Sequence, residues 1–309
     1  MEIKFAKLQG AGNDYLYIDA INDVPSCMAG DTDFYKKLSV KISDRHFGVG
    51  SDGIIIILPP SDSGKQETST QSAGLPVSAD FRMRMFNADG SEGEMCGNGI
   101  RCFAKYVYDK HLTDKNVINI ETLAGVRTVE VFLSPGTGKV KEAKVFMGLP
   151  QFETDKIPAN FNKPEIINEK LNIKGKEFVV SCVSMGNPHC VTFVEDVKNL
   201  DVPYYGNIIE NSGMFPKRIN VEFVQKLGGS DVLVRTWERG SGETLACGTG
   251  ACAVYSVMKK TGRIDGNENS VNVNLYGGGL KISGDLSGGI YMIGPAEEVF
   301  SGHFNFFRR

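Results

Sequence analysis

The sequence lacks both a basic excess and a long apolar run. Its formal net charge is −3, with 34 Lys and Arg against 37 Asp and Glu, whereas a dedicated nucleic-acid binder carries a basic patch or stripe. No stretch of about 18 apolar residues occurs, so no membrane span is expected. The start, Met1 to Lys7, has neither the apolar core of a signal peptide nor the composition of a transit segment. We therefore expect a cytoplasmic protein that binds neither nucleic acid nor a membrane.

The sequence also lacks the cysteine patterns of a disulfide framework or a zinc site. Its seven cysteines are an odd number, and without a secretion signal they favour reduced thiols. Two cysteine pairs, Cys96/Cys102 and Cys247/Cys252, are separated by five and four residues and do not form the paired knuckles of a zinc site. Walker, Rossmann and haem signatures are missing as well. We expect no metal and no organic cofactor.

One segment of the chain is present twice. In each copy an aromatic residue, Phe86 or Trp237, precedes a turn-rich segment of glycine, serine and acidic residues. Ten positions after the aromatic comes Cys-Gly-x-Gly, which begins at Cys96 or Cys247, and then a run typical of a helix. The copies lie in opposite halves of a 309-residue chain, which is long enough for two ordinary domains. We interpret them as parts of duplicated halves that face each other.

The residue patterns predict an α+β fold of two such halves, each a strand-rich unit with one central helix that opens at a cysteine. We predict one half at 1–146, to which the C-terminal tail 295–309 returns, and the other at 147–294. Residues 59–79, poor in apolar side chains, are predicted to form a long exposed or disordered loop. Helices are predicted at 31–43, 100–110 and 250–260. Strands are predicted at 3–8, up to Ile18, 54–58, 81–86, three times within 117–146, and at 178–183, 190–194, 218–224, 232–237, 271–275, 280–282 and 290–293.

The cysteine at each predicted helix start suggests acid–base chemistry. A thiol there lies beside free backbone N–H groups and the positive end of the helix dipole, which favour the thiolate and lower the thiol pKa from about 8.5. The same N–H groups can hold a substrate carboxylate, so that its α-carbon would hang between Cys96 and Cys247. Inverting a stereocentre without a cofactor requires one face to lose a proton while the other gains one. A single cysteine of this kind is usually just a small buried residue, but the repeated spacing argues against that explanation.

These motifs resemble those of diaminopimelate epimerase. The resemblance runs from the first strand to the C-terminal tail. It implies two pseudo-symmetric domains, each a barrel-like sheet wrapped around a central helix. It also implies a PLP-independent epimerase that converts L,L-diaminopimelate to the meso isomer for lysine and peptidoglycan synthesis, and a homodimer. The residues that carry it are 10–15, 86–91, 96–99, 184–189, 238–244 and 247–250.

The resemblance also implies roles for individual residues. Cys96 would act as base toward the L,L isomer, and Cys247 would donate a proton from the opposite face. Glu238 would pair with the α-ammonium group, and His189 would orient or polarise a thiol. The residues implied in substrate binding are the backbone N–H groups of Gly97, Asn98, Gly248 and Thr249, and the side chains of Asn13, Asn87, Asn187, Asn220, Glu238 and Arg239. Of these, Arg239 is the bidentate partner of the distal carboxylate.

Two departures from the family pattern stand out. Gly53 occupies a position where some relatives carry glutamine, and the insertion at 59–79 is longer than the pattern needs. Two of the implied roles also have a structural explanation, since Asn13 could stabilise a turn and His189 could be a structural histidine.

Three other functions are compatible with parts of the pattern. A proline or hydroxyproline racemase of the same fold also uses two cysteines, although its cyclic substrate has no distal carboxylate to engage Arg239. A relative that only binds small molecules would have no use for two proton donors. A thiol redox protein would have a Cys96–Cys247 disulfide as its functional state.

Overall fold

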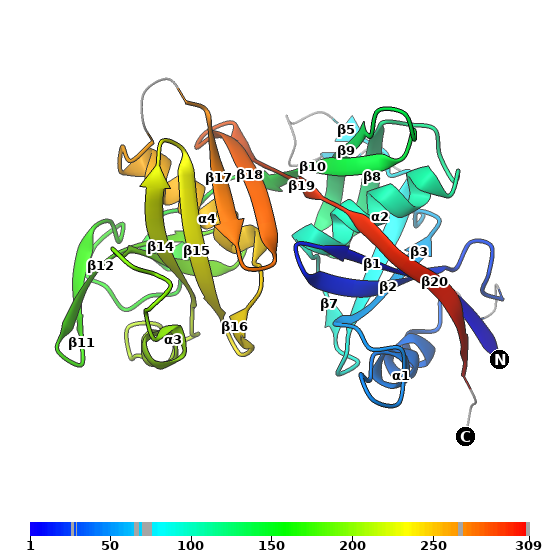
Figure 1. Ribbon diagram of the computed structural model, residues 1–309, viewed down its shortest axis with the longest axis horizontal. Helices are drawn as coiled ribbons and strands as arrows, with labels where there is room; N and C mark the ends of the chain where they lie inside the picture. The colour runs from blue at the N-terminus through cyan, green and yellow to red at the C-terminus, as the bar shows by residue number, and fades with distance from the viewer. Residues whose placement is uncertain (26–27, 29, 65–67, 70–75, 265–267, 307–309) are drawn as a thin grey trace. The chain divides into compact units, whose positions relative to one another are not determined.

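The computed structural model describes residues 1–25, 28, 30–64, 68–69, 76–264 and 268–306. The chain divides into two compact units, Met1–Phe146 with Gly294–Arg309, and Met147–Ile293. Each unit combines strands with helices (Figure 1), and the predicted α+β class is confirmed. None of the helices in the described ranges is long and apolar enough to cross a bilayer.

The strands of the first unit pair in a continuous series. The pairs β2–β3 and β6–β8 are parallel, and the others are antiparallel. The short β7 (Glu92–Gly93) adds to β6, and β4 (Thr68–Ser69) pairs with β5 (Pro76–Val77). In order of pairing, the strands are β20 (Glu297–Asn305), β1 (Glu2–Gly10), β2 (Asn13–Asp19), β3 (Gly53–Leu58), β6 (Phe81–Asn87), β8 (Val117–Thr122), β9 (Gly125–Leu133) and β10 (Val140–Gly148).

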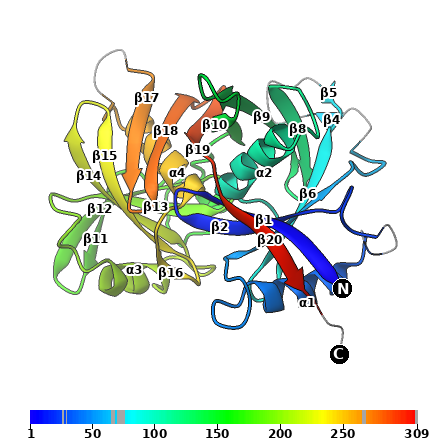
Figure 2. The ribbon, with the colours of Figure 1, turned by 45° about the vertical axis from the view of Figure 1, so that its right-hand side comes forward.

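Two helices cover opposite faces of β2 and β3 in this unit. The helix α1 (Thr32–Ile42) packs Phe34 and Leu38 against Ile54 and its neighbours. On the other face, the Tyr17 hydroxyl donates to the carbonyl of Gly99 in α2 (Gly97–Asp109) at 2.8 Å. Eleven of the 13 residues of α2 are buried, so this helix is surrounded by its own strands (Figure 2).

The second unit repeats the same order of parallel and antiparallel pairs. Here β13–β14 and β15–β17 are parallel, the other pairs are antiparallel, and the short β16 (Gly242–Thr244) adds to β15 as β7 adds to β6. The order of pairing is β11 (Glu169–Ile173), β12 (Lys176–Ser184), β13 (Pro188–Phe193), β14 (Asn220–Gly228), β15 (Asp231–Glu238), β17 (Ser270–Leu275), β18 (Gly278–Asp285) and β19 (Gly289–Pro295).

The second unit also has a central helix and an outer helix. The central helix α4 (Gly248–Lys260) contacts β12, β13, β14, β17 and β18, and ten of its 13 residues are buried. The outer helix α3 (Val202–Glu210) packs with Cys190, Val221 and Phe223 in an apolar cluster. Because side chains alternate along a strand, His189 and Glu222 point to the other face, where α4 lies.

The sequence-based predictions differ from the structure at several places. Both central helices begin directly after their cysteine, three and two residues before the predicted starts at 100 and 250. The helix α3 and the strand β11 were not predicted, although Asp201 caps α3 by accepting from the Tyr204 N–H and Pro203 lies in its first turn. Within the predicted loop at 59–79, β4 and β5 form a pair, and residues 65–67 and 70–75 lie outside the described ranges.

The cap of α1 gives a direct test of the outer helix in the first unit. Asp31 accepts from the Phe34 N–H at 2.9 Å, so Asp31→Ala should lower the free energy of unfolding by about 1 kcal/mol. Asp33→Ala, which removes an exposed carboxylate in the same turn, should cost less than about 0.5 kcal/mol. Urea unfolding of both variants measures the difference, and equal losses would contradict a capping role.

Candidate active site

Cys96 occupies the N-cap of α2, the last residue before the helix. Its backbone is extended (φ −126°, ψ 121°), and its Sγ accepts from the Gly99 N–H at 3.4 Å. The side chain is partly exposed and donates its proton to Asn13 Oδ1 at 3.2 Å. The structure therefore brings together two residues that the sequence proposed for the site, Cys96 and Asn13, from strands and loops far apart in the chain.

Asp52 holds Asn13 in this orientation and was not predicted as a site residue. Asn13 Nδ2 donates to Asp52 Oδ2 at 2.7 Å, so its Oδ1 is turned toward the thiol. Arg45 supports the other Asp52 oxygen at 3.0 Å. Burial raises the pKa of Asp52 above its ordinary value. In the sequence this aspartate is visible only as part of a glycine-rich loop, because its partner precedes it by 39 positions.

Cys247 occupies the N-cap position of α4 with nearly the same backbone angles, φ −124° and ψ 112°. It is only 5% exposed, and its Sγ lies 3.5 Å from Thr249 Oγ1. Burial raises the pKa of the Cys247 thiol well above its usual range, and Glu238 and Glu222 act in the same direction. The direction is opposite to the lowered thiol pKa expected from the sequence, because the loss of hydration outweighs the hydrogen bonds with Thr249 and Gly250 that lower the pKa.

A group of polar side chains lies beside Cys247. Asn187 Nδ2 donates to Thr249 Oγ1 at 3.3 Å, and Asn187 Oδ1 lies 2.9 Å from His189 Nε2. His189 Nδ1 lies 2.8 Å from Glu222 Oε1, and both of these side chains are fully buried. Glu222 was not predicted as a site residue. The available signal was its position two residues after Asn220 in β14, which places both side chains on the face toward α4.

Four further predicted residues belong to the second unit, and two of them, Asn220 and Arg239, form hydrogen bonds with the protein backbone. Asn220 is buried; its amide donates to the Pro188 carbonyl at 2.8 Å and accepts from the Arg239 N–H at 2.9 Å. The Arg239 side chain is exposed and donates to the Lys217 carbonyl. Glu238 accepts from the Thr244 hydroxyl at 2.6 Å. Gly248 lies buried in the first turn of α4.

The remaining predicted residues of the first unit lie in or near the segment that leads into α2. Asn87 ends β6 and donates to Ser91 Oγ at 3.0 Å. Gly97 and Asn98 form the buried first turn of α2, where Asn98 Oδ1 accepts from Arg101 at 2.9 Å. Gly53 has no room for a side chain, because a Cβ there would overlap the carbonyl oxygen of Phe86.

The last glycine of each Cys-Gly-x-Gly lies close to a strand side chain of its own unit. A Cβ at Gly99 would lie 2.7 Å from Ile55 Cδ1, and one at Gly250 would lie 2.7 Å from Glu222 Oε1. Both distances are shorter than van der Waals contact. The glycines therefore allow each helix start to approach its neighbouring strand closely.

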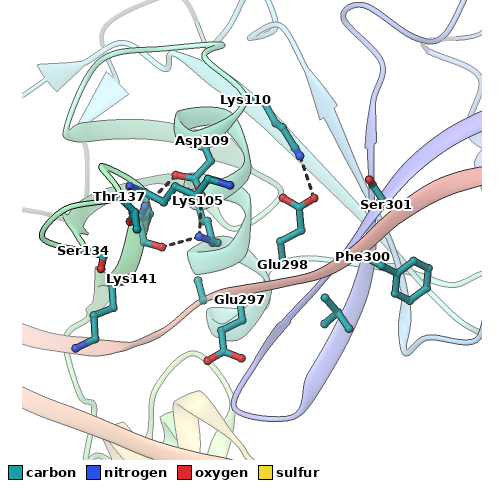
Figure 3. A pocket seen from close by; sticks show the side chains of 14 residues that line it. Lys105, Asp109, Lys110, Ser134, Thr137, Lys141, Glu297, Glu298, Phe300 and Ser301 are labelled. Carbon is teal, nitrogen blue, oxygen red and sulfur yellow. Dashed lines mark hydrogen bonds and ion pairs between the residues drawn. The ribbon is translucent and has the colours of Figure 1, made fainter.

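The described residues contain a polar pocket but no cluster of side chains arranged to hold a metal ion. No group of three or more His, Cys, Asp or Glu side chains within them has the arrangement of a metal site. A polar pocket of about 590 Å³ lies in the first unit between α2, the β9–β10 turn and β20, and none of the predicted site residues lines it. Two ion pairs lie among its lining residues, Lys105 with Asp109 and Lys110 with Glu298 (Figure 3).

Comparison with known proteins settles which family these features belong to. The family model described as diaminopimelate epimerase matches residues 5–152 and 181–299. The diaminopimelate epimerase of Acetivibrio thermocellus is 44% identical over 301 residues, which cover 97% of this chain and 98% of that protein. That of Methanococcus maripaludis is also 44% identical, over 98% of this chain and 100% of that protein. The chain belongs to the diaminopimelate epimerase family.

Membership of the diaminopimelate epimerase family makes this protein an isomerase and confirms the resemblance seen in the sequence. A solved structure supports the fold assignment. The hydroxyproline epimerase of Agrobacterium vitis superposes with a TM-score of 0.65, covering 98% of this chain and 92% of that chain at 13% identity. At that identity the likeness concerns the fold alone.

The close approach at Gly250 can be tested by adding one methyl group. Gly250→Ala places a Cβ against Glu222, which His189 holds in place, so we expect a loss of about 1–3 kcal/mol in unfolding free energy despite the better helix propensity of alanine. The control is Gly213→Ala, whose Cβ would meet nothing within 4 Å and should change stability by less than about 0.5 kcal/mol. Urea unfolding compares the variants, and unchanged stability of Gly250→Ala would refute the packing argument.

Proposed function

We propose that this protein converts L,L-2,6-diaminopimelate to the meso isomer without PLP, by proton transfer between Cys96 and Cys247. The observation that carries the proposal is the matched pair of N-cap cysteines, one in each unit, with backbone angles of −126° and 121° in one and −124° and 112° in the other. The relatives at 44% identity carry the name of this activity. The proposal requires the two units to present their thiols to opposite faces of one α-carbon.

In the proposed reaction the Cys96 thiolate removes the α-proton and the Cys247 thiol delivers another to the opposite face. One proton is taken and one is given, so the total charge of enzyme and substrate is unchanged. The raised pKa of Cys247 suits the donor, because the thiol keeps its proton until the carbanion forms. The Gly99 N–H at 3.4 Å favours negative charge on Cys96 Sγ. In the reverse direction the two roles exchange.

The substrate would be held by the two helix starts and by polar groups around them. Backbone N–H groups at Gly97, Asn98, Gly248 and Thr249 would bind the reacting carboxylate and stabilise the developing enolate. Arg239 would bind the distal carboxylate, and Glu238 the α-ammonium group.

The asparagines would take two kinds of role. Asn220, whose amide already holds the Arg239 backbone, would position that residue for the distal carboxylate. The amides of Asn13 and Asn187 would set the hydrogen bonds of the two thiols, with Asn87 as a further substrate contact.

The wider setting of the reaction is also part of the proposal. By analogy with the family we propose a homodimer in the cytoplasm, whose product enters lysine and peptidoglycan precursor synthesis. A racemase acting on proline or hydroxyproline is the alternative, and the shared fold with the hydroxyproline epimerase makes it the comparison to include in the test.

Isotope exchange distinguishes these substrates. The reduced protein is incubated in D₂O with L,L-diaminopimelate or, in parallel, trans-4-hydroxy-L-proline, and the α-protons are followed by NMR. We expect meso product carrying deuterium at one α-carbon, because the donated proton comes from a thiol in exchange with solvent. Exchange in hydroxyproline alone would move the assignment to the racemase.

Substitution of either cap cysteine tests the two-thiol mechanism. Cys96→Ala and Cys247→Ala should each lower kcat at least about a hundredfold, since each removes a general acid or base. Cys252→Ala serves as the control, because Cys252 is a fully buried residue inside α4 and should leave kcat within about threefold. Near-normal turnover by either cap variant would exclude the mechanism.

A further inference from the structure

A chain of hydrogen bonds runs from Cys247 into the core of the second unit. It passes from Cys247 Sγ to Thr249 Oγ1 at 3.5 Å and from Thr249 Oγ1 to Asn187 Nδ2 at 3.3 Å. It continues from Asn187 Oδ1 to His189 Nε2 at 2.9 Å and from His189 Nδ1 to Glu222 Oε1 at 2.8 Å. These hydrogen bonds therefore join the thiol at the start of α4 to the carboxyl group of Glu222 on β14. The Glu222 side chain is 0% exposed.

The amide of Asn187 gives this chain a direction. Its Nδ2 donates to Thr249 Oγ1, so its Oδ1 accepts from His189, which places a proton on Nε2. His189 Nδ1 and Glu222 Oε1 then share one further proton between them. Because Thr249 Oγ1 already accepts from Asn187, its own hydrogen is available to the sulfur of Cys247. A hydroxyl that donates to sulfur stabilises the thiolate.

Glu222 is hard to explain as a contribution to stability. It is fully buried, and within the described part of the chain its Oε2 has no hydrogen-bond partner. Burying a carboxyl group with one unpaired oxygen costs free energy that an apolar side chain would not. A Cβ at position 250 would also lie only 2.7 Å from Glu222 Oε1. A group kept at this cost and hydrogen-bonded to His189 points to a role carried through His189.

We propose that Glu222 is a positioning residue for Cys247. By holding His189 Nδ1, Glu222 fixes the orientation of the imidazole ring and keeps its proton on Nε2. The Nε2–H in turn fixes the orientation of the Asn187 amide. The Thr249 hydroxyl, which accepts from that amide, is then left to donate to the Cys247 sulfur. The inference rests on the proposed function, in which Cys247 alternates between thiol and thiolate. Without a partner at Nδ1 the ring can turn or change its protonated nitrogen, and the hydroxyl loses its fixed direction.

Two substitutions of Glu222 separate its hydrogen bond from its charge. Glu222→Gln and Glu222→Met both remove the carboxylate, but only glutamine can donate to His189 Nδ1. The other carboxylate that acts on Cys247, Glu238, is present in both. In a Cys96→Ala background, the rate of Cys247 alkylation by iodoacetamide is followed by peptide mass spectrometry. Glu222→Gln should stay within about threefold of the parent, while Glu222→Met should react about tenfold more slowly, equivalent to one pKa unit.

The hydroxyl end of the chain supplies a second, independent comparison. Thr249→Ser should behave as the parent, whereas Thr249→Val should match Glu222→Met, since both remove the same donation to sulfur. The double variant Glu222→Met/Thr249→Val should be no slower than Thr249→Val alone, because members of one chain are not additive. Equal rates for the glutamine and methionine variants, or additive effects in the double variant, would overturn the proposal.

Further controls guard against a general loss of structure. Thr192 lies in β13, as His189 does, but its side chain points to the opposite face of the strand and donates to the Val179 carbonyl. Thr192→Val removes this hydrogen bond and should leave the rate of Cys247 alkylation unchanged. If Glu222→Met does not fold, Glu222→Asp replaces it, because the shorter side chain withdraws the carboxyl group from His189 and should slow alkylation in the same way.

A spectroscopic readout and a turnover readout complete the test. The ¹⁵N shifts of His189 should report Nε2–H in the parent and in Glu222→Gln, and a mixture of forms in Glu222→Met. In turnover we expect kcat to follow the same order with KM unchanged. Alkylation and histidine shifts need no substrate, so they test the positioning role even if diaminopimelate is not turned over.

Discussion

Each unit depends on a helix whose first turn is buried among the strands that surround it. The first four N–H groups of a helix have no partner within the helix, and burial denies them water. In both units the residue at this point is a cysteine, and the glycine three positions later lets the turn lie against the side chain of Ile55 or Glu222 without the close contact that a Cβ would make. The buried helix end thus brings backbone N–H donors, a positive dipole end and a thiol together in one place.

The repeated strand order explains how both thiols reach equivalent positions. In each unit a strand ends at the site segment, a short strand doubles back along it, and the central helix follows at once: β6, β7 and α2 in one, β15, β16 and α4 in the other. The supports of the two thiols differ, however. Cys96 bonds to Asn13, which Asp52 holds, whereas Cys247 faces Thr249 and the side chains behind it. The repeat fixes the backbone, and each unit adds its own polar partners.

The sequence predicted the features whose signals lie within a short stretch of residues. The doubled Cys-Gly-x-Gly, the alternating strands and the three periodic helices could be identified because their signals lie within a dozen residues. The partners Asp52 and Glu222 were missed, because they meet Asn13 and His189, residues 39 and 33 positions away in the chain, only in the folded structure. The helix α3 was missed because its nine residues give only a short periodic pattern of apolar residues. Its capping aspartate and the proline in its first turn were the signals present in the sequence.

The pKa of each thiol depends on folded surroundings that the neighbouring sequence does not specify. A helix start lowers the pKa of a thiol, and that holds for any cysteine in the N-cap position. Desolvation and nearby carboxylates raise it, and their size depends on the folded surroundings. At Cys247 burial dominates, so a buried thiolate there requires hydrogen-bond donors that are already in place. Cys96 is partly exposed and has the Gly99 N–H as a donor. Two cysteines that are alike in sequence thus become chemically different through hydration and the partners that each unit provides.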